Sequence, residues 1–360
     1  MCSLENLVEH MFWTNKKVLI TGHTGFKGSW LSLWLQKLGA DVAGFALPPP
    51  TPLNLFTLAN VAEGMQSIMG DLRDYHQVAE AVKLTRPEII IHMAAQPLVR
   101  HSYQAPIETY ATNVMGTVHL FEAARQTQGV KAIINVTTDK CYENKEWERG
   151  YKEDDTLGGH DPYSNSKACA ELVTRAFQKS YFYGNSPITL ASVRAGNVIG
   201  GGDWARDRLV PDILQACLNK EAVILRNPNS TRPWQHVLEP LSGYLLLAEK
   251  LYTSPEEYAE GWNFGPNEED VKPVHWITDF IFKLWQHTGN WKQDNDPQPH
   301  EARYLKLDCT KAKHKLNWHP RWNLEKGLTE TVNWYKAFQT KQNMQDVTLD
   351  QIDRFILNSG

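Results

Sequence analysis

The stretch that most constrains the fold is T-G-H-T-G-F-K-G, at residues 21–28. It places Gly22, Gly25 and Gly28 as G-x-x-G-x-x-G between an apolar segment, 16–22, and a helical pattern, 26–39. Glycines at these positions permit a tight turn and let a pyrophosphate approach the backbone closely. The helix after this turn offers free N–H groups and a partial positive charge. We therefore expect a dinucleotide-binding turn here rather than a plain connection.

The first half of the chain alternates short apolar segments with longer helical patterns. Helices are predicted near 73–85, 107–128 and 163–182, between predicted strands at 41–47, 67–72, 88–95, 132–138 and 188–196. This alternation predicts an α/β fold with a doubly wound parallel sheet, the Rossmann architecture. The rhythm changes near residue 195. We expect 1–195 to be the main part of the cofactor domain. Residues 196–360 should form mainly a smaller substrate-binding lobe, with some segments returning to the sheet.

Composition excludes several other classes of protein. The net charge of −4 gives no electrostatic footprint for nucleic acid, and no run of about 18 apolar residues predicts a membrane segment. The five cysteines are scattered, without a disulfide framework or a metal-ligand spacing, so we expect no metal. The first residues lack the pattern of a secretory signal. A cytoplasmic location is the resulting expectation.

Residues at two later strand ends also suit a bound cofactor. Asp71, in the segment 70–72, could accept a hydrogen bond from the adenine amino group, and Ala94 and Ala95 are small enough for a cofactor to lie against the backbone. The region after the second strand, G-F-A-L-P-P-P, has no acid for a ribose hydroxyl and no base for a 2′-phosphate. The missing base favours NAD over NADP.

The segment 160–173 carries the clearest catalytic pattern. Asp161 is a suitable N-cap and Pro162 suits the first helical turn. Tyr163 and Lys167 are four residues apart, so they project from the same face of the predicted helix. A neighbouring ammonium lowers the pKa of a phenol. A phenolate beside a nicotinamide can take the proton from a sugar hydroxyl while hydride leaves.

These motifs together resemble the extended short-chain dehydrogenase/reductase family over nearly the whole chain, including the closing segment 307–335. The residues that carry the resemblance are Gly22, Gly25, Gly28, Asp71, Ala94, Ala95, Asn113, Thr138, Tyr163 and Lys167. By position, the resemblance adds cofactor contacts at His23, Thr24, Phe26, Leu72 and Thr137. It also implies a homo-oligomer, a dimer or tetramer, in which the helices near 107–128 and 163–182 form a four-helix bundle.

The two residues directly after Thr138 distinguish the branches of this family. The sugar-nucleotide 4,6-dehydratases carry an acid and a second proton-transfer group there, commonly as T-D-E, and this chain has T-D-K, with Asp139 and Lys140. With the segments 200–212 and 231–249, this variant resembles the branch that acts on CDP-D-glucose. The implied reaction oxidises carbon 4, eliminates water across carbons 5 and 6, and returns hydride to carbon 6.

In that reaction each of the three residues has a role. Thr138 would hydrogen-bond the reacting sugar oxygen, Asp139 would protonate the departing hydroxyl, and Lys140 would remove the proton from carbon 5. Both ionisable groups would need burial to shift their pKa values. The plainer interpretation of Asp139 and Lys140 is a charged pair in a solvated turn, which would exclude these roles.

The resemblance further implies contacts with a nucleotide-sugar substrate. Arginine suits a diphosphate because its planar guanidinium makes paired hydrogen bonds. Trp204 or Trp234 could stack on the base or simply fill the core. The candidate substrate contacts are Gln96, Asn197, Arg208, Arg232 and Arg303.

Three alternatives remain open from the sequence. The protein could be a dehydratase for a different nucleotide-hexose, or a nucleotide-sugar 4-epimerase, which would retain the hydroxyl on carbon 6. It could also be a non-catalytic NAD-binding scaffold, although a scaffold has no need of Thr138, Tyr163 and Lys167.

Overall fold

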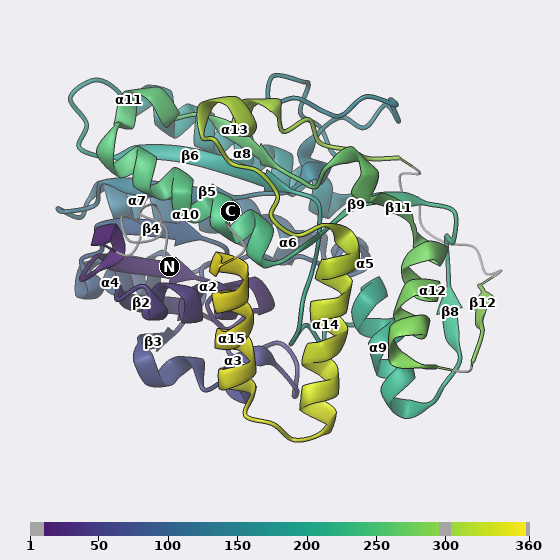
Figure 1. Ribbon diagram of the computed structural model, residues 1–360. Helices are drawn as coiled ribbons and strands as arrows, with labels where there is room; N and C mark the ends of the chain where they lie inside the picture. Colours follow the sequence, from purple (N-terminus) through teal and green to yellow (C-terminus); the bar gives the residue numbers. More distant parts are fainter. Residues whose placement is uncertain (1–10, 288, 295–303, 358–360) are drawn as a thin grey trace.

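The computed structural model describes residues 11–287, 289–294 and 304–357. Seven parallel strands form the main sheet, in the order β10-β6-β5-β4-β1-β2-β3 (Figure 1). The order reverses between β1 and β4, which confirms the predicted doubly wound sheet. The strands are β1 (Lys17–Thr21), β2 (Asp41–Ala46), β3 (Gln66–Met69), β4 (Ile89–His92), β5 (Ala132–Val136), β6 (Thr189–Ala195) and β10 (Gly261–Phe264).

The strands of this sheet carry apolar side chains on both faces, and helices cover both faces. In β4, Ile90 packs on one face, while Ile89 and Ile91 pack on the other. The first face is covered by α4 (Tyr75–Thr85), α7 (Gly116–Arg125) and α8 (Pro162–Ser180). The second face is covered by α2 (Phe26–Lys37) and α10 (Leu238–Thr253).

The region predicted as one helix, 107–128, is a run of shorter elements. It comprises α6 (Pro106–Tyr110), the π-turn η2 (Ala111–Met115) and α7, and α5 (Val99–Gln104) precedes it. One turn of π-helix shifts the direction in which side chains leave the axis. Other short elements between strands are α3 (Leu55–Leu58), η1 (Val61–Gly64) and η3 (Asp139–Cys141).

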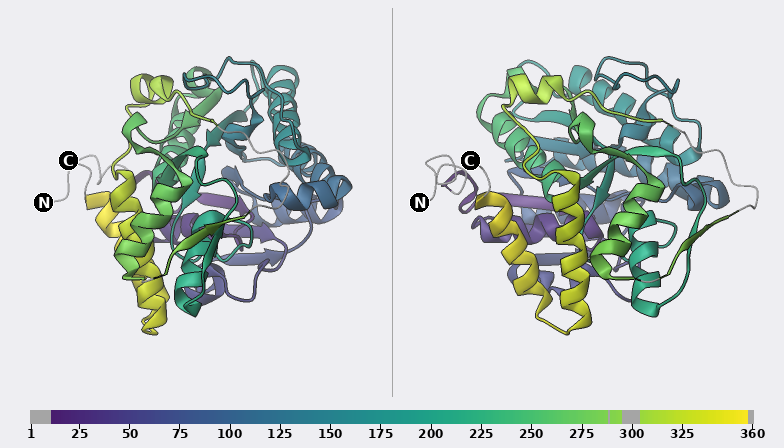
Figure 2. Two further views of the ribbon diagram at one scale, coloured as in Figure 1. Left: turned by 90° about the vertical axis from the view of Figure 1, so that its right-hand side faces the viewer. Right: turned by 45° about the vertical axis from the view of Figure 1, so that its right-hand side comes forward.

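The second half of the chain, green to yellow in Figure 2, builds a smaller body. It also adds β10 to the main sheet. Two small sheets lie here: β7 (Asn197–Ile199), β9 (Thr231–His236) and β11 (Val271–Pro273) form one, and β8 (Val223–Leu225) and β12 (Trp291–Gln293) form the other. The helical elements are α9 (Leu209–Asn219), α11 (Pro255–Tyr258), η4 (Glu268–Asp270), α12 (Val274–Trp285), α13 (Thr310–Lys315), α14 (Leu324–Gln339) and α15 (Met344–Leu357).

The last helix, α15, packs against α2 of the N-terminal half of the chain. Phe355 of α15 lies edge-on against Trp34 of α2, with ring centroids 5.7 Å apart, and Lys37 pairs with Asp353 at 2.8 Å. The two yellow helices α14 and α15 lie side by side in both figures. This packing helps to bury Trp34, which is 3% exposed. Among the described helices, none is long and apolar enough to cross a membrane.

Candidate active site

A cavity of about 1710 Å³ lies over the carboxyl ends of β1, β4, β5 and β6. The glycine turn, the segment 93–95, the segment 136–140 and the segment 195–200 all line it, and each directly follows one of these strands. Residues 202–213 and 223–232 close it from the smaller body. Pockets for one small ligand measure about 300–1,000 Å³, so this cavity has room for two.

The glycine turn forms a cradle that larger residues would fill. Gly22 has a φ of +79°, which disfavours any residue with a side chain. A Cβ on Gly22 would lie 2.7 Å from the Ala94 nitrogen, and one on Gly28 would lie 2.1 Å from the Gly22 carbonyl oxygen. Gly25 and Phe26 also line the cavity, and Thr24 Oγ1 donates to the Leu47 carbonyl at 2.8 Å. The turn therefore offers bare backbone at the start of α2.

Two predicted cofactor contacts, His23 and Asp71, differ in position: only Asp71 lines the cavity. The His23 ring does not line the cavity: it packs against Gly44 and lies 2.7 Å from Ser67 Oγ, and burial lowers its pKa to about 4. Asp71 does line the cavity, beside Leu72. Arg73 binds its carboxylate at 2.9 and 3.0 Å and holds its pKa below the usual range.

Asn113 and Gln96 do not line the cavity. They lie behind the loop that follows β4 and support it through hydrogen bonds. Asn113, in the π-turn η2, accepts from the Gln96 amide at 2.8 Å and donates to Ser166 Oγ of α8 at 2.9 Å. The Gln96 side chain donates to Thr109 Oγ1 at 2.9 Å. Both amides are thus occupied in supporting the loop after β4, where Ala94 and Ala95 do face the cavity.

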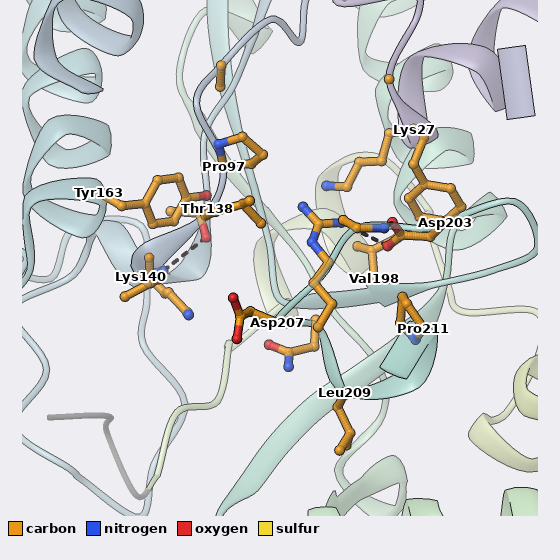
Figure 3. Close-up of a pocket in the computed structure, with 18 of the residues that line it drawn as sticks. Lys27, Pro97, Thr138, Lys140, Tyr163, Val198, Asp203, Asp207, Leu209 and Pro211 are labelled. Atoms are coloured by element: carbon orange, nitrogen blue, oxygen red, sulfur yellow. Dashed lines mark hydrogen bonds and ion pairs between the residues drawn. The ribbon is translucent and has the colours of Figure 1, made fainter. Parts of the chain in front are cut away.

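The short 3₁₀ turn η3 presents the predicted acid and base. Thr138 has extended backbone, and its Oγ1 donates to Asp139 Oδ1 at 3.0 Å. Asp139 is 1% exposed and burial raises its pKa, while its Oδ2 has no hydrogen-bond partner among the described residues. Lys140 is only half-buried, so the fully dry setting expected for it is not found. Figure 3 shows Thr138, Lys140 and Tyr163 along one side of the cavity.

Tyr163 and Lys167 come from the first turns of α8. Asp161 accepts from the Ser164 amide at 2.9 Å, which confirms the predicted N-cap, and Pro162 is the first helical residue. Lys167 Nζ donates to the Val136 carbonyl at 3.0 Å, and burial lowers the pKa of this lysine to about 8.

The expected fall in the Tyr163 pKa is wrong for the protein alone. Burial raises it to about 12, more than a hydrogen bond with Thr138 and the charge of Arg208 lower it. Lys167 contributes little because its ammonium points to a β5 carbonyl instead of the phenol.

A buried ion pair beneath the turn was not predicted from the sequence. Glu171 and Arg194 pair at 2.7 Å, with side chains at most 1% exposed. Thr137 Oγ1 donates to Glu171 at 2.6 Å, and Arg194 donates to the Tyr142 hydroxyl at 2.7 Å. The pair therefore holds the residues on both sides of the turn that carries Asp139. Breaking such a buried pair on one side costs about 3–5 kcal/mol.

The candidate substrate contacts occupy the other side of the cavity. Asn197, Arg208 and Arg232 line it, and Arg208 pairs with Asp203 at 2.9 Å. Trp204 and Trp234 also line it but are mostly buried: Trp204 packs edge-on against Tyr335 and Phe338, and Trp234 donates to the Lys272 carbonyl. Arg303 lies outside the described residues.

Comparison with known proteins assigns this arrangement to a family. Residues 19–331 match the family described as GDP-mannose 4,6 dehydratase. The chain belongs to this family. The matched residues include the described segments that line the cavity from both halves of the chain.

Individual relatives agree with the assignment. The chain is 55% identical to CDP-glucose 4,6-dehydratase of Salmonella typhimurium over 342 residues, covering 94% of this chain and 95% of that protein. It is 27% identical to a probable dTDP-glucose 4,6-dehydratase of Sinorhizobium fredii, covering 89% and 92%. The structure of dTDP-glucose 4,6-dehydratase from Bacillus anthracis, solved in complex with NAD, has the same fold, with a TM-score of 0.75, 23% identity and coverage of 91% and 98%.

One further residue of this dehydratase-family site escaped the sequence analysis. Lys27 lies within the glycine turn, and its side chain extends into the cavity between Tyr163 and Asp203 (Figure 3). A lysine in a turn is usually a surface residue, so nothing in the local sequence marks it. Among the described residues, no group of three or more His, Cys, Asp or Glu could hold a metal ion.

Proposed function

We propose that the protein dehydrates CDP-D-glucose to CDP-4-keto-6-deoxy-D-glucose, with NAD as its bound cofactor. The observation that carries this proposal is the pair Asp139–Lys140, placed directly after Thr138 on the cavity wall that Tyr163 also lines. A redox step alone would need only Thr138, Tyr163 and Lys167. An additional buried acid beside an accessible amine supplies what elimination of water requires. The 55% identity to a CDP-glucose 4,6-dehydratase supports the choice of nucleotide.

The glycine cradle fits the pyrophosphate of NAD. The backbone at Gly22, Gly25 and Gly28 leaves no room for side chains, and the N–H groups of the first turn of α2 are directed toward the cavity end of the helix. Ala94, Ala95, Leu72 and Thr24 would border the bound cofactor. When bound, NAD+ would supply the hydride acceptor for carbon 4 and a positive charge near Tyr163.

Tyr163 would act as the base for the sugar 4-hydroxyl. Its pKa of about 12 in the protein alone makes it a phenol at neutral pH, so its deprotonation depends on positive charge brought to the buried site. Thr138 is hydrogen-bonded to it and would orient the same sugar oxygen. Lys167 connects α8 to the end of β5 through its hydrogen bond to the Val136 carbonyl.

Asp139 and Lys140 would divide the elimination between them. Burial favours the protonated form of Asp139, which can donate a proton to the hydroxyl leaving carbon 6. Lys140, on the same turn but half-buried, would remove the proton at carbon 5 in its neutral form. Reprotonation of carbon 5 after hydride return completes the balance of atoms, so the net loss is water.

The nucleotide would lie toward the smaller body. Asn197, Arg208 and Arg232 are the described residues that we assign to the substrate, and Arg303 remains a proposed contact on sequence grounds. Arg208 forms an ion pair with the Asp203 carboxylate, and this pair holds the Arg208 guanidinium at the cavity wall.

The test is incubation of the protein with CDP-, dTDP-, GDP- and UDP-hexoses. We expect a 4-keto-6-deoxy product, read by its alkali-induced absorbance, from CDP-D-glucose at a rate well above the others. A faster reaction with another nucleotide would replace the substrate but keep the reaction. A product that retains the carbon-6 hydroxyl would indicate an epimerase, and absence of turnover across the panel would indicate a scaffold.

We also propose that the protein forms a cytoplasmic homo-oligomer. Helices α5, α6 and η2 pack against α8, and this group carries exposed apolar side chains at Tyr103, Ile107, Met115 and Leu172. Ile107 is 85% exposed, and apolar side chains that gather on one surface mark interaction sites. These residues support the helical contact expected from the sequence.

A further inference from the structure

Three polar atoms near the turn η3 are buried and have no hydrogen-bond partner among the described residues. They are Asp139 Oδ2, the hydroxyl of Tyr244 and the side-chain oxygen of Gln235. Their side chains are at most 3% exposed and come from three separate elements, η3, α10 and β9. Buried polar groups in proteins are almost always hydrogen-bonded. Three such atoms therefore need an explanation.

Asp139 Oδ2 lies against β9, the strand that carries Gln235. A Cβ added to Gly196 would lie 3.2 Å from Oδ2 and 2.6 Å from Pro233 Cγ, which places Oδ2 on the side of β9 where the Pro233 ring projects. Pro233 and Gln235 are two residues apart in β9, so their side chains leave the strand on the same face. The Gln235 side chain therefore shares a face of β9 with Asp139.

Tyr244 joins the same region from α10. Its ring packs edge-on against the Phe264 ring, with centroids 5.8 Å apart, and the Gln235 amide donates to the Phe264 carbonyl at 2.8 Å. Burial raises the pKa of Tyr244, and the charges of Tyr163 and Asp139 raise it further. Tyr244 therefore stays protonated, close enough to Asp139 for the two groups to interact.

One water molecule can satisfy all three atoms. The Tyr244 phenol is a donor, whereas Gln235 Oε1 and Asp139 Oδ2 are acceptors. A water that accepts from the phenol can donate its two hydrogens to the two acceptors. Buried waters typically make about three hydrogen bonds to polar groups that are otherwise unsatisfied, and they commonly bridge groups too far apart for a direct bond.

We propose that Tyr244 is a positioning residue for the catalytic acid, acting on Asp139 Oδ2 through a buried water that Gln235 also holds. The water occupies Oδ2, so the acidic proton of Asp139 is carried by Oδ1, the oxygen that Thr138 contacts. When this proton passes to the hydroxyl leaving carbon 6, Asp139 becomes a carboxylate, and the water stabilises the new charge. The inference rests on the proposed function for the role of Asp139.

The experiment compares wild type with Tyr244→Phe, which removes only the hydroxyl. Its first readout is the pKa of Asp139 in the protein without substrate, followed by the infrared carboxyl band that is missing from Asp139→Asn. Loss of a hydrogen bond that favours the carboxylate should raise this pKa by about one pH unit in Tyr244→Phe.

Other ionisable groups also face Asp139, and all of them are the same in the two proteins. The difference between wild type and Tyr244→Phe therefore isolates the contribution of the Tyr244 hydroxyl. These groups are Lys140 of η3, Cys141 at the end of that turn, Arg232 of β9, Lys27 of α2 and Tyr163 of α8.

The second readout is turnover of CDP-D-glucose. Tyr244→Phe should eliminate water about tenfold more slowly. Its activity should also be lost at a higher pH than that of wild type, because the protonated form of Asp139 is the active one. Reduction of NAD+ in a single turnover should keep the wild-type rate, because oxidation at carbon 4 does not use Asp139.

Tyr252→Phe is the matched control for this variant. Tyr252 lies on the same helix, does not line the cavity and donates its hydroxyl to Glu88 at 2.5 Å. Its loss should leave the pKa of Asp139 and the rate of elimination at their wild-type values. Tyr244→Phe should keep a Tm close to that of wild type, because the ring remains and the hydroxyl has no hydrogen bond to a described residue.

The outcomes separate this inference from the proposed function. An unchanged pKa of Asp139 in Tyr244→Phe would overturn the inference, and so would slow elimination explained by a large fall in Tm. If the pKa rises as expected but wild type forms no 4-keto-6-deoxy product, the proposed function fails while the link between Tyr244 and Asp139 stands.

Discussion

Replacing Asp139 with asparagine is expected to lower kcat by about 10²- to 10⁴-fold, the usual contribution of a general acid. The amide keeps the shape of the side chain and its contact with Thr138 but has no acidic proton for the departing hydroxyl. Oxidation at carbon 4 does not use this proton. The variant should therefore still reduce bound NAD+ in a single turnover, visible as absorbance of the reduced nicotinamide.

The pH profile of wild type should report the same group. Burial raises the pKa of Asp139, and the protonated form is the active one. Activity through this group is therefore fully present below its raised pKa and lost as pH rises through it. In Asp139→Asn that limb should be absent. If the loss of activity with rising pH persists unchanged in the variant, another residue causes that loss.

Stability provides the control for this variant. Asp139 Oδ2 is buried without a hydrogen-bond partner among the described residues, so its ionised form costs stability as pH rises. Asp139→Asn should be at least as stable as wild type at pH 7, measured by its Tm. A variant that is inactive and also much less stable would show that the side chain serves the fold and would weaken the catalytic assignment.

Replacing Lys140 with alanine is expected to block elimination at the preceding step, removal of the carbon-5 proton. The side chain lies on the cavity wall, and the predicted loss of kcat is again about 10²- to 10⁴-fold. The measurement is exchange of the carbon-5 hydrogen with deuterated solvent, because exchange requires proton removal but not loss of water. Hydride transfer from carbon 4 should remain measurable in a single turnover.

Lys145→Ala is the matched control for this variant. Lys145 lies five residues further along the same segment, is half-exposed and pairs with Glu143 at 3.4 Å, outside the set of residues that line the cavity. It should exchange the carbon-5 hydrogen at the wild-type rate. If Lys140→Ala did the same, Lys140 would not be the base.

The sequence was sufficient for features that depend on local pattern. The glycine spacing, the alternation of strands and helices, and the four-residue separation of Tyr163 and Lys167 each act within a few residues of one another. The doubly wound architecture follows from this alternation, whereas the order of the strands comes from the structure. These features placed the glycine turn, Thr138 and Asp139 around one cavity without any long-range information.

Features that depend on distant partners could not be predicted in the same way. Asn113 carries a family signature, yet its amide supports Gln96 and α8, because the π-turn directs it behind the wall. The direction of the Lys167 ammonium depends on a β5 carbonyl, so its expected effect on Tyr163 was wrong. The charge of Arg208 acts on Lys27 in the cavity, although Arg208 lies far from Lys27 along the chain.

The most direct test of the account is the fate of deuterium placed at carbon 4 of CDP-D-glucose. The proposed reaction removes hydride from carbon 4 and returns it to carbon 6 of the same sugar within one closed site. We predict that the 4-keto-6-deoxy product carries the deuterium in its carbon-6 methyl group, as measured by NMR and mass spectrometry. Deuterium retained at carbon 4, or lost to solvent while product forms, would contradict the account.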